Sequence, residues 1–205
     1  MTDKIHLIGN GDLAVLFKKQ KDTKGLKVIC NMPPFEVYNV YATCMVDFKM
    51  MKALQEGSLQ LDMYHWILGT RPRKWMEMQP GFYMKYAHCV KDFYPVVPKY
   101  AVNSTNFNCG HMAAHYCANK LEGKEIHMYG FDTLFDFNMR SVTDLYLSSD
   151  RSDTNNYRLL NNWRPIWPKL FAEFPQSKFV LHHNHDDLKI TLESKNVEVV
   201  VESPR

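Results

Sequence analysis

The chain has 205 residues, of which 45% are apolar and 23% charged, and its formal net charge at pH 7 is +3. This composition is typical of a folded globular protein with one sizeable core, and it excludes low-complexity and disordered chains. No apolar run approaches the ~18 residues that span a membrane, so no membrane partner is expected. So small a net charge does not indicate a nucleic-acid-binding protein.

The cysteines are odd in number and form no CxxC pair, and most of them stand in apolar stretches: Cys30, Cys44, Cys89, Cys109 and Cys117. This pattern favours free thiols and a cytoplasmic location, in the host cytoplasm if the protein is viral. The N-terminal residues lack the basic and then apolar profile of a secretory signal. Because no linker, repeat or low-complexity tract divides the sequence, we expect a single domain over residues 1–205.

Apolar, β-rich runs alternate with helix-like stretches along the chain. The predicted strands are residues 5–9, 26–31, 41–47, 64–69, 126–131, 178–183 and 197–201, and the predicted helices are residues 13–20, 48–55, 82–93, 111–121 and 157–174. Pro165 and Pro168 must kink or break the last helix. Several strands are continuously apolar, as strands buried on both faces of a parallel sheet are. The alternation predicts an α/β fold with a single doubly wound, mostly parallel, Rossmann-like sheet.

The first predicted strand ends abruptly in the tripeptide Gly9-Asn10-Gly11 within KIHLIGNGDLAVLFKK. A strand followed by a glycine turn and a helix N-terminus can present backbone N–H groups to an anion, because glycine lets a ligand approach closely. The same tripeptide is also an ordinary tight turn. Both interpretations stay open at this point.

Polar side chains follow most of the predicted strands. They are Asn10, Asp12, Asn31, Asp47, Thr70, Arg71 and Asp132. In open α/β sheets ligands bind outside the carboxyl ends of the strands, where the strand order reverses. Each residue alone could instead cap a helix, as Asp and Asn often do. Together they predict a polar rim around a binding crevice.

The segment FNCGHMAAHYCANKLEGKEIHMYGFD contains a second helix N-terminus with a glycine. Asn106 or Asn108 can cap this helix, and Gly110 keeps its first turn open. Two such termini facing one crevice would suit the phosphates and sugar of a nucleotide.

The order of these motifs resembles the sialyltransferase families, which use a CMP-activated sugar. The motifs are GNG after the first strand, VICN at the end of the second, and the Gly110 helix followed by KEIHMYGFD. The resemblance implies a sialyltransferase-like fold and glycosyltransferase activity. It also implies that Asn10 and Asn31 contact the nucleotide or its ribose and that the turn from Asn108 to Gly110 holds phosphate. Asp47 falls where bacterial members place an asparagine near the donor.

The sequence departs from these families at two points. Cys109 stands where they have Ser or Thr, and the segment of residues 134–158, from which they supply a histidine base, contains no histidine here. Glycosyl transfer needs a base for the acceptor hydroxyl and charge stabilisation for the departing nucleotide. Asp132 is the first candidate base, Asp47 the second and His111 the third.

A metal-free mechanism is expected, because no DxD-like motif stands at a strand end. Arg71, Arg151 and the helix N-termini would then stabilise the phosphate charge, and residues 148–158 have the composition of a lid. His111 and His115 share a helix face, and HHNHD (residues 182–186) adds further ligand-type residues. Neither group has the Glu of HExxH or a cysteine pair, so neither a metal nor a cofactor is expected.

These observations predict a glycosyltransferase that transfers a sugar from a nucleotide sugar to a hydroxyl group of the acceptor. The chain is similar in style to small proteins of tailed bacteriophages, so the acceptor could be hydroxymethylcytosine in phage DNA, or else a glycan. The alternative is a non-catalytic nucleotide-binding or sequestering protein, and a third hypothesis is metal-dependent hydrolysis at HHNHD. Release of nucleotide from a nucleotide sugar would separate the first two.

Overall fold

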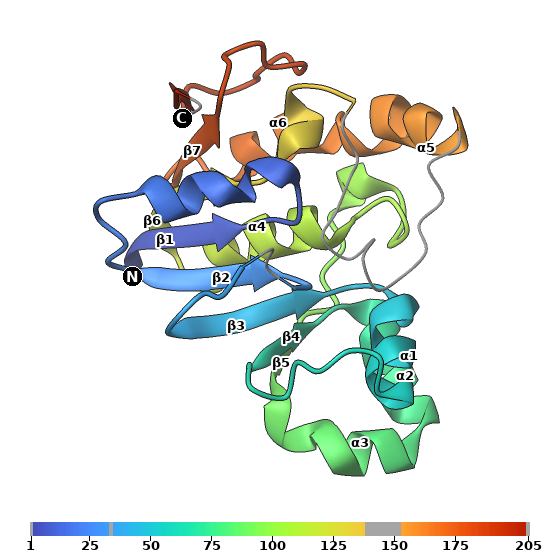
Figure 1. Cartoon of the computed structure of the whole chain (residues 1–205). Helices are drawn as coiled ribbons and strands as arrows, with labels where there is room; N and C mark the ends of the chain where they lie inside the picture. Colours follow the sequence, from blue (N-terminus) through green and yellow to red (C-terminus); the bar gives the residue numbers. More distant parts are fainter. Residues whose placement is uncertain (1, 33–34, 138–152, 204–205) are drawn as a thin grey trace.

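The computed structural model describes residues 2–32, 35–137 and 153–203. A single sheet of eight parallel strands runs through this part of the chain (Figure 1), in the order β5-β4-β3-β2-β1-β6-β7-β8. The strands are β1 (Thr2–Ile8), β2 (Leu26–Cys30), β3 (Val40–Met45), β4 (Trp66–Leu68), β5 (Val90–Phe93), β6 (Gly123–Tyr129), β7 (Lys178–His183) and β8 (Val197–Val201). The α/β fold class predicted from the sequence is confirmed, and all the described strand pairings are parallel.

Helices and short helical turns connect the strands. The α-helices are α1 (Phe48–Glu56), α2 (Thr70–Met78), α3 (Pro80–Tyr86), α4 (Cys109–Asn119), α5 (Asp153–Arg158) and α6 (Ile166–Glu173). Four 3-10 helices, η1 (Asp12–Lys19), η2 (Ala87–Cys89), η3 (Lys99–Ala101) and η4 (Asp132–Leu134), and one π-helix, η6 (Leu159–Trp163), complete the described elements. In this part of the chain, no helix has both the length and the apolar character needed to cross a bilayer.

The sequence prediction is wrong at two elements. Residues 82–93 were expected to form one helix, but α3 ends at Tyr86 and the chain continues into β5. β5 is a four-residue edge strand whose side chains are mostly half-buried, so it lacks the apolar run that marks the inner strands. The second missed element, α2, is strongly polar and buries Pro72 and Met76 as its main core contacts.

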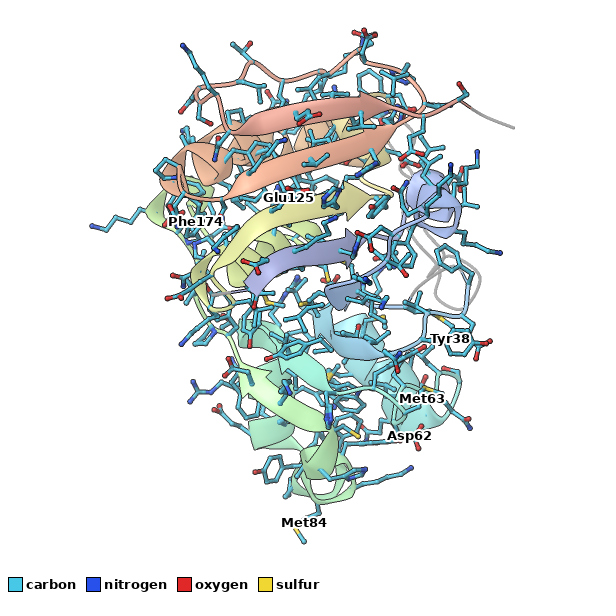
Figure 2. The ribbon with its side chains drawn as sticks, turned by 90° about the vertical axis from the view of Figure 1, so that its left-hand side faces the viewer. Tyr38, Asp62, Met63, Met84, Glu125 and Phe174 are labelled. Carbon is cyan, nitrogen blue, oxygen red and sulfur yellow. The ribbon has the colours of Figure 1, made fainter. Side chains whose placement is uncertain are left out.

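Helices cover both faces of the sheet. Ala113 and Ala114 of α4 and Leu170 of α6 pack against one face in a core that includes Leu7 and Val28. The opposite face packs against η1 near β1, and against α1 to α3 near β3 and β4. Figure 1 shows η1 in front of the sheet and α4 behind it. In the rotated view of Figure 2, Met84 of α3 lies at one end of the molecule.

The strand order places the reversal point between β1 and β6. From β1 the chain winds outward through β2, β3, β4 and β5, and it then crosses back through α4 to β6 on the other side of β1. η1 and α1 to α3 precede this crossover and lie on one face of the sheet. α6 follows it and lies on the opposite face, as right-handed connections require. The carboxyl ends of β1 and β6 therefore flank the position at which doubly wound proteins bind ligands.

Candidate functional site

The loop after β1 is hydrogen-bonded along the loop after β6. The Gly9 amide donates to the Tyr129 carbonyl (2.7 Å), and the Gly11 amide donates to the Gly130 carbonyl (3.0 Å). A Cβ atom at residue 9 would lie 2.6 Å from the Gly130 carbonyl oxygen, and a Cβ atom at residue 11 would lie 2.7 Å from the Asp132 carboxylate. Both glycines are thus needed for close packing between chain segments.

Asn10 connects this loop to the end of β2. Its side-chain amide donates to the carbonyl oxygens of Cys30 and Met32, each at 2.7 Å. These two bonds identify the nitrogen of the Asn10 amide, so its oxygen must be the acceptor for Asn31, whose Nδ2 donates at 3.3 Å. Because the Asn31 atom in this bond is the donor, it must be the nitrogen, and the other atom of the Asn31 side-chain amide is the oxygen.

The Asn31 side-chain oxygen is buried and has no hydrogen-bond partner among the described residues. The whole residue is 9% exposed, and its backbone has a φ of 53°, a left-handed conformation that asparagine tolerates better than most residues. The backbone groups of Asn31 are both bonded. Its N–H donates to the Cys44 carbonyl (2.8 Å), and its carbonyl accepts from the Thr43 hydroxyl (2.6 Å). A buried acceptor without a donor is uncommon in folded proteins and calls for an explanation.

Asp132 lies beneath the β1 loop and is 2% exposed. Its carboxylate accepts hydrogen bonds from the Leu13 amide at 3.2 and 3.4 Å, at the N-terminal end of η1. Burial raises the pKa of Asp132 to about 6, assisted by the charges of Asp136 and Asp12, while bonds from the Leu13 and Asp12 amides oppose the shift. The carboxylate therefore has the pKa of a base that works near neutrality, yet it also caps η1.

The N-terminus of α4 lies beside the loop that follows β6, because Gly110 packs against the ring of Phe131 in that loop. Asn108 caps this helix by accepting from the His111 amide (3.1 Å), and the His111 ring accepts from the Asn108 amide (3.2 Å). The Gly110 segment and the Gly9–Gly11 segment thus flank the Gly130–Asp132 turn from two sides.

His111 is a capping residue in this structure, in contrast to its predicted role as a candidate base. It is fully buried, and its second ring nitrogen is bonded to the Trp163 carbonyl (3.1 Å). Burial lowers the pKa of His111 to about 3, so the ring is neutral near pH 7. His115 bonds instead to the Tyr94 hydroxyl (2.6 Å) and pairs with Glu173 (3.3 Å). The two histidines therefore have separate partners.

Asp47 and Arg71 bind each other. The Arg71 guanidinium lies 2.5 Å from the Asp47 carboxylate, and both side chains are partly exposed. Asp47 precedes α1 but makes no side-chain cap bond to it. This pair stands after β3 and β4, on the same edge as Asn31 but further from the reversal point. Arg151, the remaining predicted phosphate ligand, lies outside the described residues, as do residues 148–152 of the expected lid.

Sequence reasoning did not anticipate that Asp136 would meet two histidines from the end of β7. One ligand-type atom from each of Asp136, His183 and His185 lies within 4.8 Å of the others. The sequence grouped His183 with His182 and Asp186, but His182 bonds to Glu202 (2.6 Å) and to His127 (2.8 Å) instead. The His-x-His spacing was the available signal, whereas Asp136 is 47 residues away and only the pairing of β6 with β7 brings it near.

Comparisons with family models, with curated proteins and with solved structures gave no match for this chain. The function must therefore be argued from the site itself.

Proposed function

We propose that the protein is a glycosyltransferase that binds a nucleotide sugar at the carboxyl edge of the sheet, between β1 and β6. The observation that supports this proposal most is the buried oxygen of Asn31, which has no donor among the described residues. It stands at the end of β2, beside Asn10 and next to the reversal point. This oxygen needs an O–H or N–H donor, and a ribose hydroxyl or a base amine can supply one.

The phosphates of the nucleotide would lie toward the N-terminus of α4. The positive end of a helix stabilises anions, and Gly110 contributes no side chain to the first turn of α4, where the ring of Phe131 packs against it. Arg71 is the described arginine nearest in the strand order to Asn31 on this edge, and it could exchange its bond to Asp47 for a phosphate oxygen. No metal ion is needed for these contacts.

Asp132 would act as the base in transfer. The acceptor oxygen attacks the anomeric carbon, and the bond between that carbon and the phosphate oxygen breaks with its electrons on the phosphate. The hydroxyl proton goes to the Asp132 carboxylate, whose pKa of about 6 leaves it mostly ionised at pH 7. To reach an acceptor the carboxylate must give up its bonds to the Leu13 amide.

A nucleotide-binding protein without transferase activity is the second candidate, and one observation favours it. Asp132 and His111, two of the three predicted bases, are both engaged in hydrogen bonds that cap helices. The third, Asp47, is paired with Arg71. A protein that only binds nucleotide requires no base.

A panel of CMP, UDP and GDP with their sugars tests the proposal. A ligand present at 100 times its dissociation constant stabilises the folded state by about 2.7 kcal/mol. For a domain of this size that corresponds to a rise in melting temperature of about 5–10 °C. The ligands that raise it are then incubated with glycans or with DNA containing hydroxymethylcytosine, and released nucleotide is measured. Release that depends on an acceptor supports transfer, binding without release supports the second candidate, and no binding contradicts both.

A further inference from the structure

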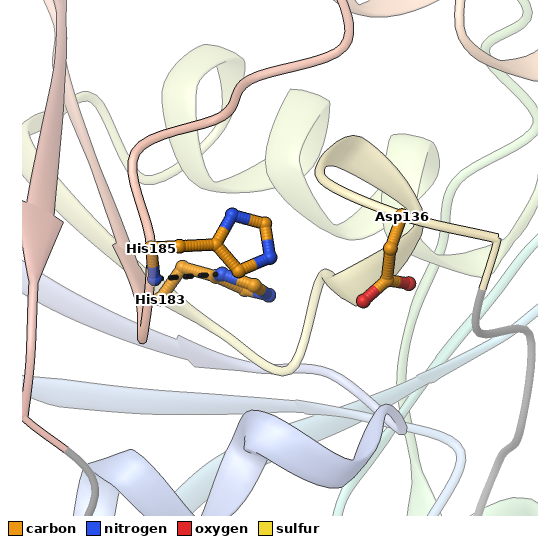
Figure 3. Close-up of side chains that lie close together, drawn as sticks. All are labelled: Asp136, His183 and His185. Carbon is orange, nitrogen blue, oxygen red and sulfur yellow. Dashed lines mark hydrogen bonds between the residues drawn. The ribbon is translucent and has the colours of Figure 1, made fainter.

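A second cluster of polar side chains lies on the same edge of the sheet, beyond β6. It consists of Asp136, which follows η4, together with His183 at the end of β7 and His185 two residues later. Figure 3 shows ring nitrogens of both histidines facing the Asp136 carboxylate. The His183 ring is held by stacking on Phe135, with ring centroids 3.9 Å apart.

The hydrogen bonds around His183 leave one of its ring nitrogens without a partner among the residues that the structure describes. Its Nδ1 accepts from the His185 backbone amide at 3.3 Å, so in the neutral ring the proton is on Nε2. That Nε2 atom is buried and has no hydrogen-bond partner in the described part of the chain. The residue itself is 1% exposed. An unpaired buried donor is energetically unfavourable.

His185 shows the same feature. Its Nδ1 is buried and without a partner among the described residues, although the residue as a whole is partly exposed. The two imidazole rings lie in edge contact, with centroids 4.1 Å apart. Two neighbouring histidines with unsatisfied nitrogens beside a carboxylate indicate a ligand that all three residues share.

We propose that Asp136, His183 and His185 bind a divalent transition-metal ion, with Zn²⁺ as the best fit. Two imidazole nitrogens and one carboxylate oxygen suit Zn²⁺, whereas Mg²⁺ and Ca²⁺ prefer oxygen ligands alone. Three protein ligands are the number found in catalytic zinc sites, where water or substrate takes the fourth position. The site uses none of the residues proposed to contact the nucleotide, although the Asp136 amide donates to the Asp132 carbonyl (3.0 Å).

Binding requires small movements and one proton shift. In a tetrahedral Zn²⁺ site with bonds of about 2.0–2.1 Å, two ligand atoms lie about 3.3–3.4 Å apart, so a spread of up to 4.8 Å must close by up to roughly 1.5 Å. Asp136 is partly exposed, which leaves its carboxylate room to move. If His183 coordinates through Nε2, its proton moves to Nδ1 and the long bond from the His185 amide is lost.

A positive charge lies near the cluster. The Arg164 guanidinium donates to the carbonyls of Thr133 (2.7 Å) and Asp136 (2.5 Å). Its positive charge beside the site opposes cation binding, so we expect weaker binding than in a closed four-ligand zinc site.

The test is metal binding by the untagged protein at pH 7.5. Equilibrium dialysis followed by elemental analysis should find one Zn²⁺ per chain and no bound Mg²⁺. His185→Asn and Asp136→Asn should each reduce Zn²⁺ affinity at least tenfold. Asp186→Asn and His65→Gln are matched controls, because both residues are exposed and outside the cluster, and neither should change the stoichiometry.

Two further measurements exclude trivial results. Circular dichroism of the metal-free variants must show an unchanged fold. In addition, Co²⁺ substituted for Zn²⁺ should give the visible absorption of a low-symmetry site, and this absorption should be lost in His185→Asn. Zn²⁺ bound equally by His185→Asn, Asp136→Asn and the parent protein would overturn the proposal, and so would no binding by the parent.

Discussion

The side-chain oxygen of Asn10 accepts a 3.3 Å hydrogen bond from the side-chain amide of Asn31, and this bond joins the loops that follow β1 and β2. Asn10 is itself fixed by its bonds to the carbonyls of Cys30, at the end of β2, and of Met32 in the loop that follows. The arrangement leaves the Asn31 oxygen buried, oriented and without a donor among the described residues. A ligand that supplies an O–H or N–H group at this point would complete the network.

Gly11→Ala should destabilise the protein for a purely steric reason. The backbone at residue 11 has φ −71° and ψ 165°, which alanine adopts freely. The new methyl group would nevertheless lie 2.7–2.8 Å from the Asp132 carboxylate atoms. We expect a loss of about 1–3 kcal/mol in the free energy of unfolding, measured by urea denaturation.

The control for this variant is Gly81→Ala. Residue 81 is in α3, and a Cβ there would have no neighbour within 4 Å, so the change should be neutral or slightly stabilising. If Asp132→Ala does not reduce the cost of Gly11→Ala in a double-mutant cycle, the clash with Asp132 is not its cause.

Asp132→Asn should change how stability depends on pH. The pKa of Asp132 is raised to about 6 in the folded state, against about 3.9 in an unfolded chain. The folded protein therefore keeps this proton when the unfolded chain has lost it, and the free energy of unfolding falls as pH rises from about 4 to 6. The variant should lack this fall, which is on the order of 2–3 kcal/mol.

Asp62→Asn serves as the control, because Asp62 is exposed. Urea denaturation of the three proteins at pH 4 and pH 7 measures the difference. Equal pH dependence in Asp132→Asn and the parent would show that the carboxyl is not desolvated as the structure indicates. If Asp132 is also the base of a transferase, turnover in Asp132→Asn should fall by roughly 10²–10⁴ with little change in nucleotide affinity.

His111→Gln should improve resistance to acid. The pKa of His111 is lowered to about 3 by burial, so the folded state holds this ring neutral while the unfolded chain binds a proton below pH ~6.5. The contribution of the neutral His111 ring to the free energy of unfolding is thus fully present above that pH and is lost as the pH falls. Gln at the third helical position can still accept from the Asn108 amide, as in a capping box.

The expected result is a smaller loss of stability between pH 6.5 and 4, together with a cost of about 1–3 kcal/mol at pH 8 for the lost bond to Trp163. Thermal unfolding at several pH values measures both effects. His65→Gln, at an exposed position, should behave like the parent protein, and an identical acid response in His111→Gln would contradict the assignment.

Local sequence patterns were sufficient to predict most of the fold. Buried strands such as β1 and β7 contain short, mainly apolar stretches, and their alternation with helices indicates the α/β class. β5 could not be predicted from its own residues, because an edge strand that is half exposed has no such run. The break in the predicted helix of residues 157–174 falls at Pro165, which precedes α6. Pro168 instead fits within the first turn of α6.

The positions of the candidate site residues were predictable from the sequence, but their hydrogen bonds were not. The rule that ligands bind at strand ends brought Asn10, Asn31 and Asp132 to one edge, and the structure places them there. Which atoms remain unsatisfied depends on hydrogen bonds between distant segments, such as His111 with Trp163 or Asn10 with Met32. Similarly, no local pattern joins Asp136 to His183.

The most direct test of the proposed nucleotide site is calorimetric titration of the parent protein and Asn31→Gly with the nucleotide that gives the largest thermal shift. Glycine keeps the left-handed backbone at residue 31, where φ is 53°, so the variant removes the side chain without adding strain. Asn39→Gly is the matched control, because Asn39 has a φ of 56° and is exposed. Loss of one neutral hydrogen bond should weaken binding by about 1 kcal/mol, or about fivefold. Affinity reduced in Asn31→Gly and retained in Asn39→Gly is the predicted result, and equal affinity in all three proteins would contradict a nucleotide site at Asn31.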